Sequence, residues 1–178
     1  SKGDASIALP VLRIQRSGAT ALNRIGAQQV QLQQGNKTRA LPLGWKGSDQ
    51  ESGAGFAPGT ASRPDAKACI TIHPPYRGGA GTMWADMRLA LPDISPISLE
   101  FSTAIRDHTE KEPPSDGVEW RVYAAGDDGR YAQLFTRFSD SKRWEEAKVS
   151  QYAGKTITLR LGNGPRPKGD TTRVSGYW

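Results

Sequence analysis

The chain has few of the residues that build cross-linked or metal-bound sites. Its 178 residues include one cysteine, Cys69, and two histidines, His73 and His108. A single cysteine excludes an intrachain disulfide, and Cys69 opens an apolar run, which predicts a small buried side chain in a strand. Zinc centres usually need more histidine and cysteine than this. No apolar run is long enough to span a bilayer, so the sequence indicates no membrane helix.

Positive charge is in excess but is not concentrated. The formal net charge is +6 and the sequence pI is about 9.6, yet the longest run of consecutive lysines and arginines is two residues. No helix-turn-helix, zinc-finger or ribonucleoprotein-type motif accompanies these cations, so a nucleic-acid partner is not indicated. Scattered cations are typical of a solvated surface. They also fit an anionic partner such as an acidic or sulfated glycan.

Helical periodicity is almost absent, whereas strand patterns recur along the chain. Only Gly18–Gln29 and Trp144–Lys148 have a short helix-like spacing of apolar residues. The segment Gly35–Lys67 is rich in Gly, Ser, Ala and Pro and is predicted to be a long loop. Strands are predicted at Ile7–Ile14, Val30–Gln33, Cys69–Ile72, Trp84–Leu91, Ile97–Ile105, Val118–Ala124, Tyr131–Phe138, Thr156–Leu161 and Arg173–Trp178.

These strands are short, and one face of each is apolar. Twenty glycines and 12 prolines supply the turns between them. Two antiparallel sheets that pack against each other bury the apolar sides of all these strands between them. The sequence therefore predicts an all-β fold, an antiparallel β-sandwich of the jelly-roll kind. No repeat or composition break divides the chain, so a single domain over residues 1–178 is expected.

The segment "ITIHPPYRGGAGTMWAD" joins two of these strands. Two prolines hold the backbone extended after His73, so Tyr76 and Arg77 would be presented with little entropy to lose on binding. A tyrosine ring stacks on the apolar face of a sugar, and arginine donates hydrogen bonds to hydroxyls or a carboxylate. His73, Tyr76 and Arg77 are therefore candidate sugar contacts. The alternative is a structural strand cap with a buried His73. The glycines at 78–81 fit no phosphate-binding motif and predict a flexible loop.

A polar loop from Arg106 to Asp116 follows the clearest strand. Arg106 and His108 are candidate ligand contacts, and Asp107, Glu110 and Asp116 offer the oxygen ligands that Ca²⁺ prefers. The spacing of these carboxylates does not match an EF-hand, so a plain solvated loop remains the alternative.

Two of the five tryptophans are candidate sugar platforms. Trp45 lies in the long polar loop, and charged residues flank Trp144. Trp120 is in phase with apolar neighbours of its strand and is predicted to lie in the core, as are Trp84 and Trp178.

Four elements in the second half of the chain form a characteristic set. These are Asp116-Gly117-Val118 with Trp120, Gly129, Tyr152-Ala153-Gly154-Lys155 and Tyr177-Trp178. They carry a resemblance to the galactose-binding-domain-like β-sandwiches, including the carbohydrate-binding modules attached to secreted bacterial glycoside hydrolases. The resemblance covers about half of the chain. It implies a secreted, extracellular or periplasmic module of a larger protein. Such a module binds a polysaccharide or oligosaccharide, including acidic ones, beside an appended catalytic domain, and some hold a structural calcium.

Two other classes of function stay open from the residues alone. One is a structural β-sandwich spacer that binds no ligand, and the other is a small polysaccharide lyase or hydrolase. A glycosidase needs two carboxylates in tuned environments, and no pair is distinguished by its context. No GxSxG motif indicates a serine nucleophile. A non-catalytic module is therefore the favoured interpretation.

Overall fold

The computed structural model describes residues 9–16, 18–61, 67–105, 110–111, 117–139, 143–165 and 176–178. Within them the chain forms strands and two short 3-10 turns, and no helix is long and apolar enough to cross a membrane. The elements are β1 (Leu12–Arg13), η1 (Leu22–Arg24), β2 (Gln29–Gln34), β3 (Lys37–Ala40), β4 (Gly47–Ser48), β5 (Gly55–Ala61), β6 (Lys67–His73), β7 (Gly81–Ala90), β8 (Ser98–Ile105), β9 (Val118–Ala125), β10 (Tyr131–Ser139), β11 (Arg143–Lys148), η2 (Ser150–Tyr152), β12 (Thr156–Gly164) and β13 (Gly176–Tyr177).

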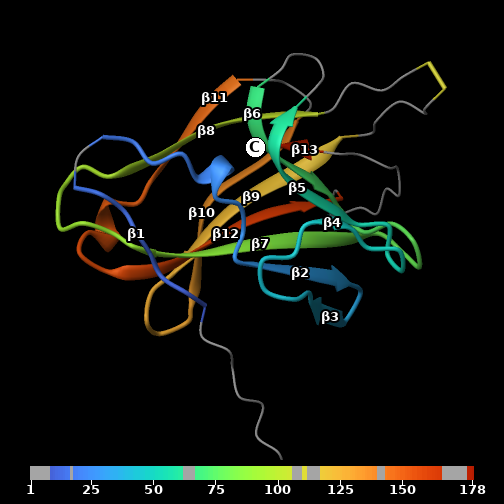
Figure 1. Ribbon diagram of the computed structural model, residues 1–178, viewed down its shortest axis with the longest axis horizontal. Coiled ribbons are helices and arrows are strands. Elements are labelled where there is room, and N and C mark those ends of the chain that lie inside the picture. The colour runs from blue at the N-terminus through green and yellow to red at the C-terminus, as the bar shows by residue number, and fades with distance from the viewer. Residues whose placement is uncertain are drawn as a thin grey trace, which may run out of the picture.

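The strands form two sheets (Figure 1). The seven-stranded sheet has the order β10-β9-β12-β7-β2-β3, and β1 joins it by pairing with β7 in parallel. The six-stranded sheet has the order β11-β8-β13-β6-β5-β4. Among the described strands, every pairing except that of β1 with β7 is antiparallel. The predicted all-β antiparallel sandwich is thus confirmed.

The core lies between the two sheets, and the alternation of the strands explains it. In β9 every second residue is buried, from Val118 through Trp120 to Ala124, while the residues between them are only partly covered. The same pattern in β7 buries Met83, Ala85 and Met87. Burial of these alternate side chains against the facing sheet supplies the main driving force for the fold.

Several sequence predictions are confirmed by these elements. Cys69 is buried, and Trp120 and Trp178 belong to the core. The turn after β9 is closed by a bond from the Gly129 amide to the Gly126 carbonyl at 3.1 Å. Trp178 also donates its indole N–H to the Asn163 amide oxygen at 2.5 Å.

Three predictions about secondary structure are wrong. Gly35–Lys67 is not a strandless loop, because β3, β4 and β5 lie within it. Gly18–Gln29 contains only the single turn η1 and the first residue of β2, and Trp144–Lys148 belongs to strand β11. The strands in these segments form by pairing with other strands, β3 with β2, β4 with β5 and β11 with β8, rather than from a local pattern. Of the predicted opening strand Ile7–Ile14, the described residues include only Leu12–Arg13 in strand form.

Candidate functional site

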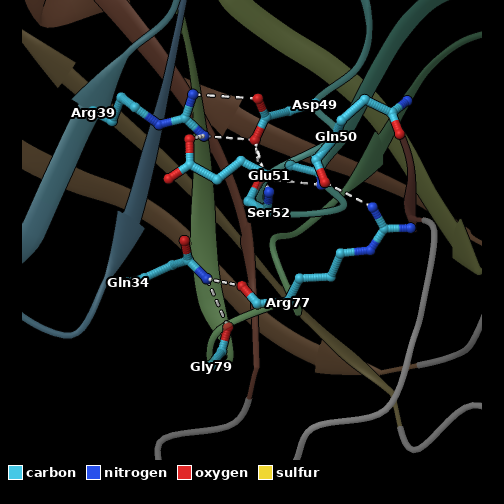
Figure 2. A network of polar contacts seen from close by, with 9 residues as sticks. Gln34, Arg39, Asp49, Gln50, Glu51, Ser52, Arg77 and Gly79 are labelled. Carbon is cyan, nitrogen blue, oxygen red and sulfur yellow. Dashed lines mark hydrogen bonds and ion pairs between the residues drawn. The ribbon is translucent and has the colours of Figure 1, made fainter.

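The segment after β6 is bound to the turn that precedes β5. The amides of Tyr76 and Arg77 both donate to the carbonyl of Ser52 at 2.9 Å. Figure 2 shows this region, where the turn that begins at Asp49 faces the loop at Arg77. The structure therefore brings three predicted residues, His73, Tyr76 and Arg77, to one rim of the sandwich.

Tyr76 is half-buried because its ring packs against a backbone that has no side chain. A Cβ placed on Gly53 would lie 2.4 Å from Cε1 of Tyr76, and the φ of Gly53 is +73°, so only glycine fits there. The His73 ring packs on the other side at 5.1 Å between ring centroids, tilted by 58°. Most of the tyrosine ring is thus used in packing within the protein.

Arg77 is exposed, and its polar groups make internal contacts (Figure 2). Its Nη1 donates to the Gln50 carbonyl at 2.7 Å. Its own carbonyl accepts a hydrogen bond from Gln34 Nε2 at 2.9 Å, and the same amide donates to Gly79 at 2.8 Å. The glycine-containing turn is therefore held to the end of β2, which favours a structural role for part of this rim.

An ion pair lies beside the same rim. Arg39 donates through two nitrogens to the Asp49 carboxylate, at 3.2 and 2.5 Å, and Ser52 donates to it from its amide at 2.9 Å. The hydrogen bond from Arg39, aided by those from Ser52, lowers the pKa of Asp49 from 3.8 to about 2. The carboxylate is thus fixed as an anion that organises the turn.

The other predicted ligand residues are not brought to this rim by the described structure. Trp45 lines a separate recess with Phe56 and Pro58. Trp144 lies in β11, and a sugar contact there stays a prediction. Arg106, Asp107, His108 and Asp116 lie outside the described residues, and Glu110 is exposed in a turn. Within the described part of the chain no three acidic, histidine or cysteine side chains gather as a metal site, and the calcium hypothesis stays a prediction.

Sequence reasoning missed an aromatic and polar surface on the seven-stranded sheet. Trp84 was predicted to lie in the core, and this is wrong: it sits between buried Met83 and Ala85 in β7, so its side chain points to the opposite, outer face. We call this surface the Trp84 face. Its residues are Gln33, Trp84, Asp86, Glu119, Arg121, Tyr123, Tyr131, Gln133, Thr136 and Arg160.

The Trp84 indole extends over the neighbouring strand because that strand carries a glycine at the paired position. Gly162 of β12 pairs with Trp84 on one side and with Arg121 on the other. A Cβ on Gly162 would lie 2.3 Å from Cζ3 of the indole. The missing side chain is therefore what makes room for the ring on the sheet.

Other aromatic rings and two guanidinium groups surround the indole. Tyr123 meets it edge-on, with ring centroids 5.5 Å apart and an interplanar angle of 76°. The guanidinium carbons of Arg121 and Arg160 lie 5.8 and 5.7 Å from its centroid, and that of Arg160 lies 4.0 Å from the Tyr131 centroid. Such contacts hold long side chains in defined positions.

Arg121 and Arg160 are each paired with a carboxylate. Arg160 donates to both oxygens of Asp86, at 2.7 and 2.8 Å, and Asp86 is 2% exposed. Arg121 donates to Glu119 at 2.6 Å. Burial alone would raise the pKa of Glu119, but the hydrogen bond and charge of Arg121 outweigh it and lower that pKa. Burial likewise opposes the charge of Arg160, yet Asp86 raises the arginine pKa overall. The face therefore combines aromatic surface with charges that neutralise one another.

Two glutamine amides flank the aromatic pair. Gln33 Oε1 accepts the indole N–H of Trp84 at 3.2 Å, and Gln133 Oε1 accepts the Tyr123 hydroxyl at 3.0 Å. These contacts use the oxygens and orient the amide nitrogens. Neither amide nitrogen donates a hydrogen bond to another residue that the structure describes, so both remain available as donors.

The phase of β7 contained a signal for this surface. In the strand predicted at Trp84–Leu91, the alternation of a strand places Trp84 on the same side as Asp86 and Arg88. Charged residues in phase with an aromatic residue indicate an outer face, whereas the hydrophobicity of the indole alone suggested the core.

No protein-family model matches the chain, and no curated protein sequence matches it. A solved structure described as concerning "the promiscuous specificity of the carbohydrate-binding modules from the beta-sandwich super family" has a similar arrangement, with a TM-score of 0.41 and 9% sequence identity. The similarity covers 79% of this chain, which spans 64% of the other. At these values it says nothing about a ligand of this chain.

Proposed function

We propose that this domain is a non-catalytic carbohydrate-binding module and that it binds its glycan on the Trp84 face. The observation that carries the proposal is the indole of Trp84 extended over Gly162, with Tyr123 edge-on and the guanidinium carbons of two arginines within about 6 Å over the ring. A fixed aromatic ring on an open sheet offers a surface for the C–H groups of a pyranose.

The polar groups of the face suit an uncharged sugar. Sugar hydroxyls both donate and accept hydrogen bonds, and the amide nitrogens of Gln33 and Gln133, which donate to no other described residue, lie beside the aromatic pair. Because Arg121 and Arg160 already face carboxylates, an added anionic group would gain little net attraction here. A neutral stretch of polysaccharide is therefore the ligand that fits.

The carboxylates of this face are poorly suited to glycoside hydrolysis. That chemistry needs one carboxylic acid whose pKa is raised so that it can protonate the leaving group. The pKa of Glu119 is lowered, and Asp86 is held in an ion pair by both of its oxygens. A binding role therefore suits these groups better than an acid–base role.

In a longer parent protein, such a module would act by localisation. Attachment to a polysaccharide raises the effective concentration of an appended catalytic domain at its substrate, even when each binding event is weak. We propose this targeting role together with the sugar binding.

Affinity electrophoresis in gels containing neutral plant and algal polysaccharides tests the proposal. We expect retardation of the native domain and a loss of about tenfold or more in affinity for Trp84→Ala, as for a central aromatic anchor. Arg77→Ala is the matched variant at the rim and should retain binding. If Arg77→Ala loses glycan affinity while Trp84→Ala retains it, the binding site lies at the rim and not on the Trp84 face. Failure of the native domain to bind any glycan would favour the spacer hypothesis.

A further inference from the structure

A second aromatic surface lies apart from the Trp84 face, between η1 and the start of β5. It is a recess of about 550 Å³, within the roughly 300–1,000 Å³ typical of small-molecule sites. The described residues that line it include Arg24, Gly26, Trp45, Lys46 and Phe56. Phe56 is buried, and half-buried Trp45 both packs against the core and lines the recess.

The charge of this recess differs from that of the Trp84 face. Arg24 and Lys46 are both exposed, and neither forms an ion pair with another described residue. No aspartate or glutamate is among the described residues that line the recess. Aromatic residues therefore adjoin two cations that have no carboxylate partner among the residues that the structure describes.

The backbone on both sides of the recess is fixed by hydrogen bonds. The carbonyl of Leu22 accepts the amide of Gly26 at 3.1 Å, which closes the turn that carries Arg24. The amide of Trp45 donates to the Pro42 carbonyl at 3.1 Å. Both walls of the recess are thus held before a ligand arrives, which reduces the entropy lost on binding.

We propose that this recess binds an anionic sugar residue, one that carries a carboxylate or a sulfate. The indole of Trp45 would stack on the ring, and Arg24 and Lys46 would pair with the charged group. The inference rests on the proposed function only in taking a sugar as the ligand, and it concerns different residues. The domain would then have two binding surfaces. The Trp84 face would bind a neutral glycan, and the recess would bind a charged sugar residue.

The test compares two matched pairs of immobilised polymers at physiological salt. Polygalacturonate is paired with its methyl-esterified form, and dextran sulfate with dextran, so that each pair differs in charge. The main variant is Arg24→Gln/Lys46→Gln, whose side chains are exposed and whose replacement should leave the fold intact. The control is Lys37→Gln/Lys155→Gln, which lowers the net charge equally with two exposed lysines that do not line the recess.

We expect retention on one or both polyanions, weaker retention on the uncharged partner, and a loss of about tenfold in Arg24→Gln/Lys46→Gln that the control does not reproduce. The difference between the variants should shrink at high salt, because exposed charges are screened. Preference for carboxylate or for sulfate identifies the group that is bound. No retention on either polyanion, equal retention of charged and uncharged polymers, or equal losses in the two double variants would overturn the inference.

Trp84→Ala separates this inference from the proposed function. We expect it to lose neutral glycans and to retain the polyanion. If it loses the polyanion as well, the anionic sugar binds on the Trp84 face and the recess is not its site. If the native domain binds the polyanion through the recess but no neutral glycan, the inference stands and the proposed function of the Trp84 face fails.

Discussion

Replacement of Asp86 by asparagine removes the negative charge beneath the Trp84 face with little change in shape. Asp86 is 2% exposed, and its partner Arg160 has a side chain that is 20% exposed. With an effective dielectric constant of about 20 and charges about 4 Å apart, their attraction is roughly 4 kcal/mol. Removal of one member leaves a largely buried guanidinium without its counter-ion, which costs about 3–5 kcal/mol in comparable pairs.

Arg160 retains some solvent and its contact with the Tyr131 ring at 4.0 Å. We therefore expect the lower end of this range, a loss of about 3 kcal/mol in the free energy of unfolding. Urea titration followed by tryptophan fluorescence measures it, and an unchanged slope with urea would show that the extent of unfolding is the same. Arg160→Met and the double variant complete a mutant cycle that isolates the coupling between the two charges.

Asp49→Asn is the control for this prediction. Its partner Arg39 has a side chain that is 40% exposed, so the loss should be about 1 kcal/mol or less. If Asp86→Asn costs no more than Asp49→Asn, the Asp86–Arg160 pair is not the buried element that the geometry implies. The explanation of why the Trp84 face stays ordered would then be wrong.

Three further predictions concern glycines and pH. Gly162→Ala should displace the indole and lower neutral-glycan affinity about tenfold in affinity electrophoresis, whereas Gly126→Ala, which has open space around it, should not. Gly53→Ala should lower the unfolding free energy in urea by about 1–3 kcal/mol, because the new methyl group meets the Tyr76 ring. Because the folded-state pKa of Asp49 is about 2, below 3.8, its stabilisation is complete above about pH 4 and is lost as pH falls toward 2. Thermal melts between pH 5 and pH 2 should show a flatter decline for Asp49→Asn than for the native domain.

The sequence predicts those strands that have one buried face and one solvent-exposed face. In β9, Val118 and Val122 alternate with Glu119 and Arg121, and that pattern determines the inward face without any knowledge of partners. Strand β3 has no such pattern, since three of its four residues are exposed. It forms a strand because its backbone pairs with that of β2. This pairing cannot be predicted from the residues of β3 themselves.

In the candidate site, too, contacts between segments far apart in the chain could not be predicted from the sequence. Tyr76 and Arg77 were found because prolines and an unusual composition mark them in the sequence, yet their surroundings depend on Ser52 and Gly53, which come from another loop. The position of Trp84 depends on Gly162, a residue far along the chain that only the register of two strands brings alongside. Gly162 matters because it lacks a side chain and so leaves room for the indole. No pattern in the neighbouring sequence predicts this role.

The position of β13 has a consequence for the order in which the domain forms. This strand of two residues, Gly176–Tyr177, lies between β6 and β8, and Trp178 exchanges backbone hydrogen bonds with Ile70 at 2.9 Å in both directions. During synthesis β8 and β6 therefore emerge long before the strand that joins them. The six-stranded sheet can be completed only after translation has passed residue 178, and until then the exposed edges of β6 and β8 are open to incorrect pairing. A purified chain truncated before Gly176 should thus be more sensitive to protease than the chain that contains β13.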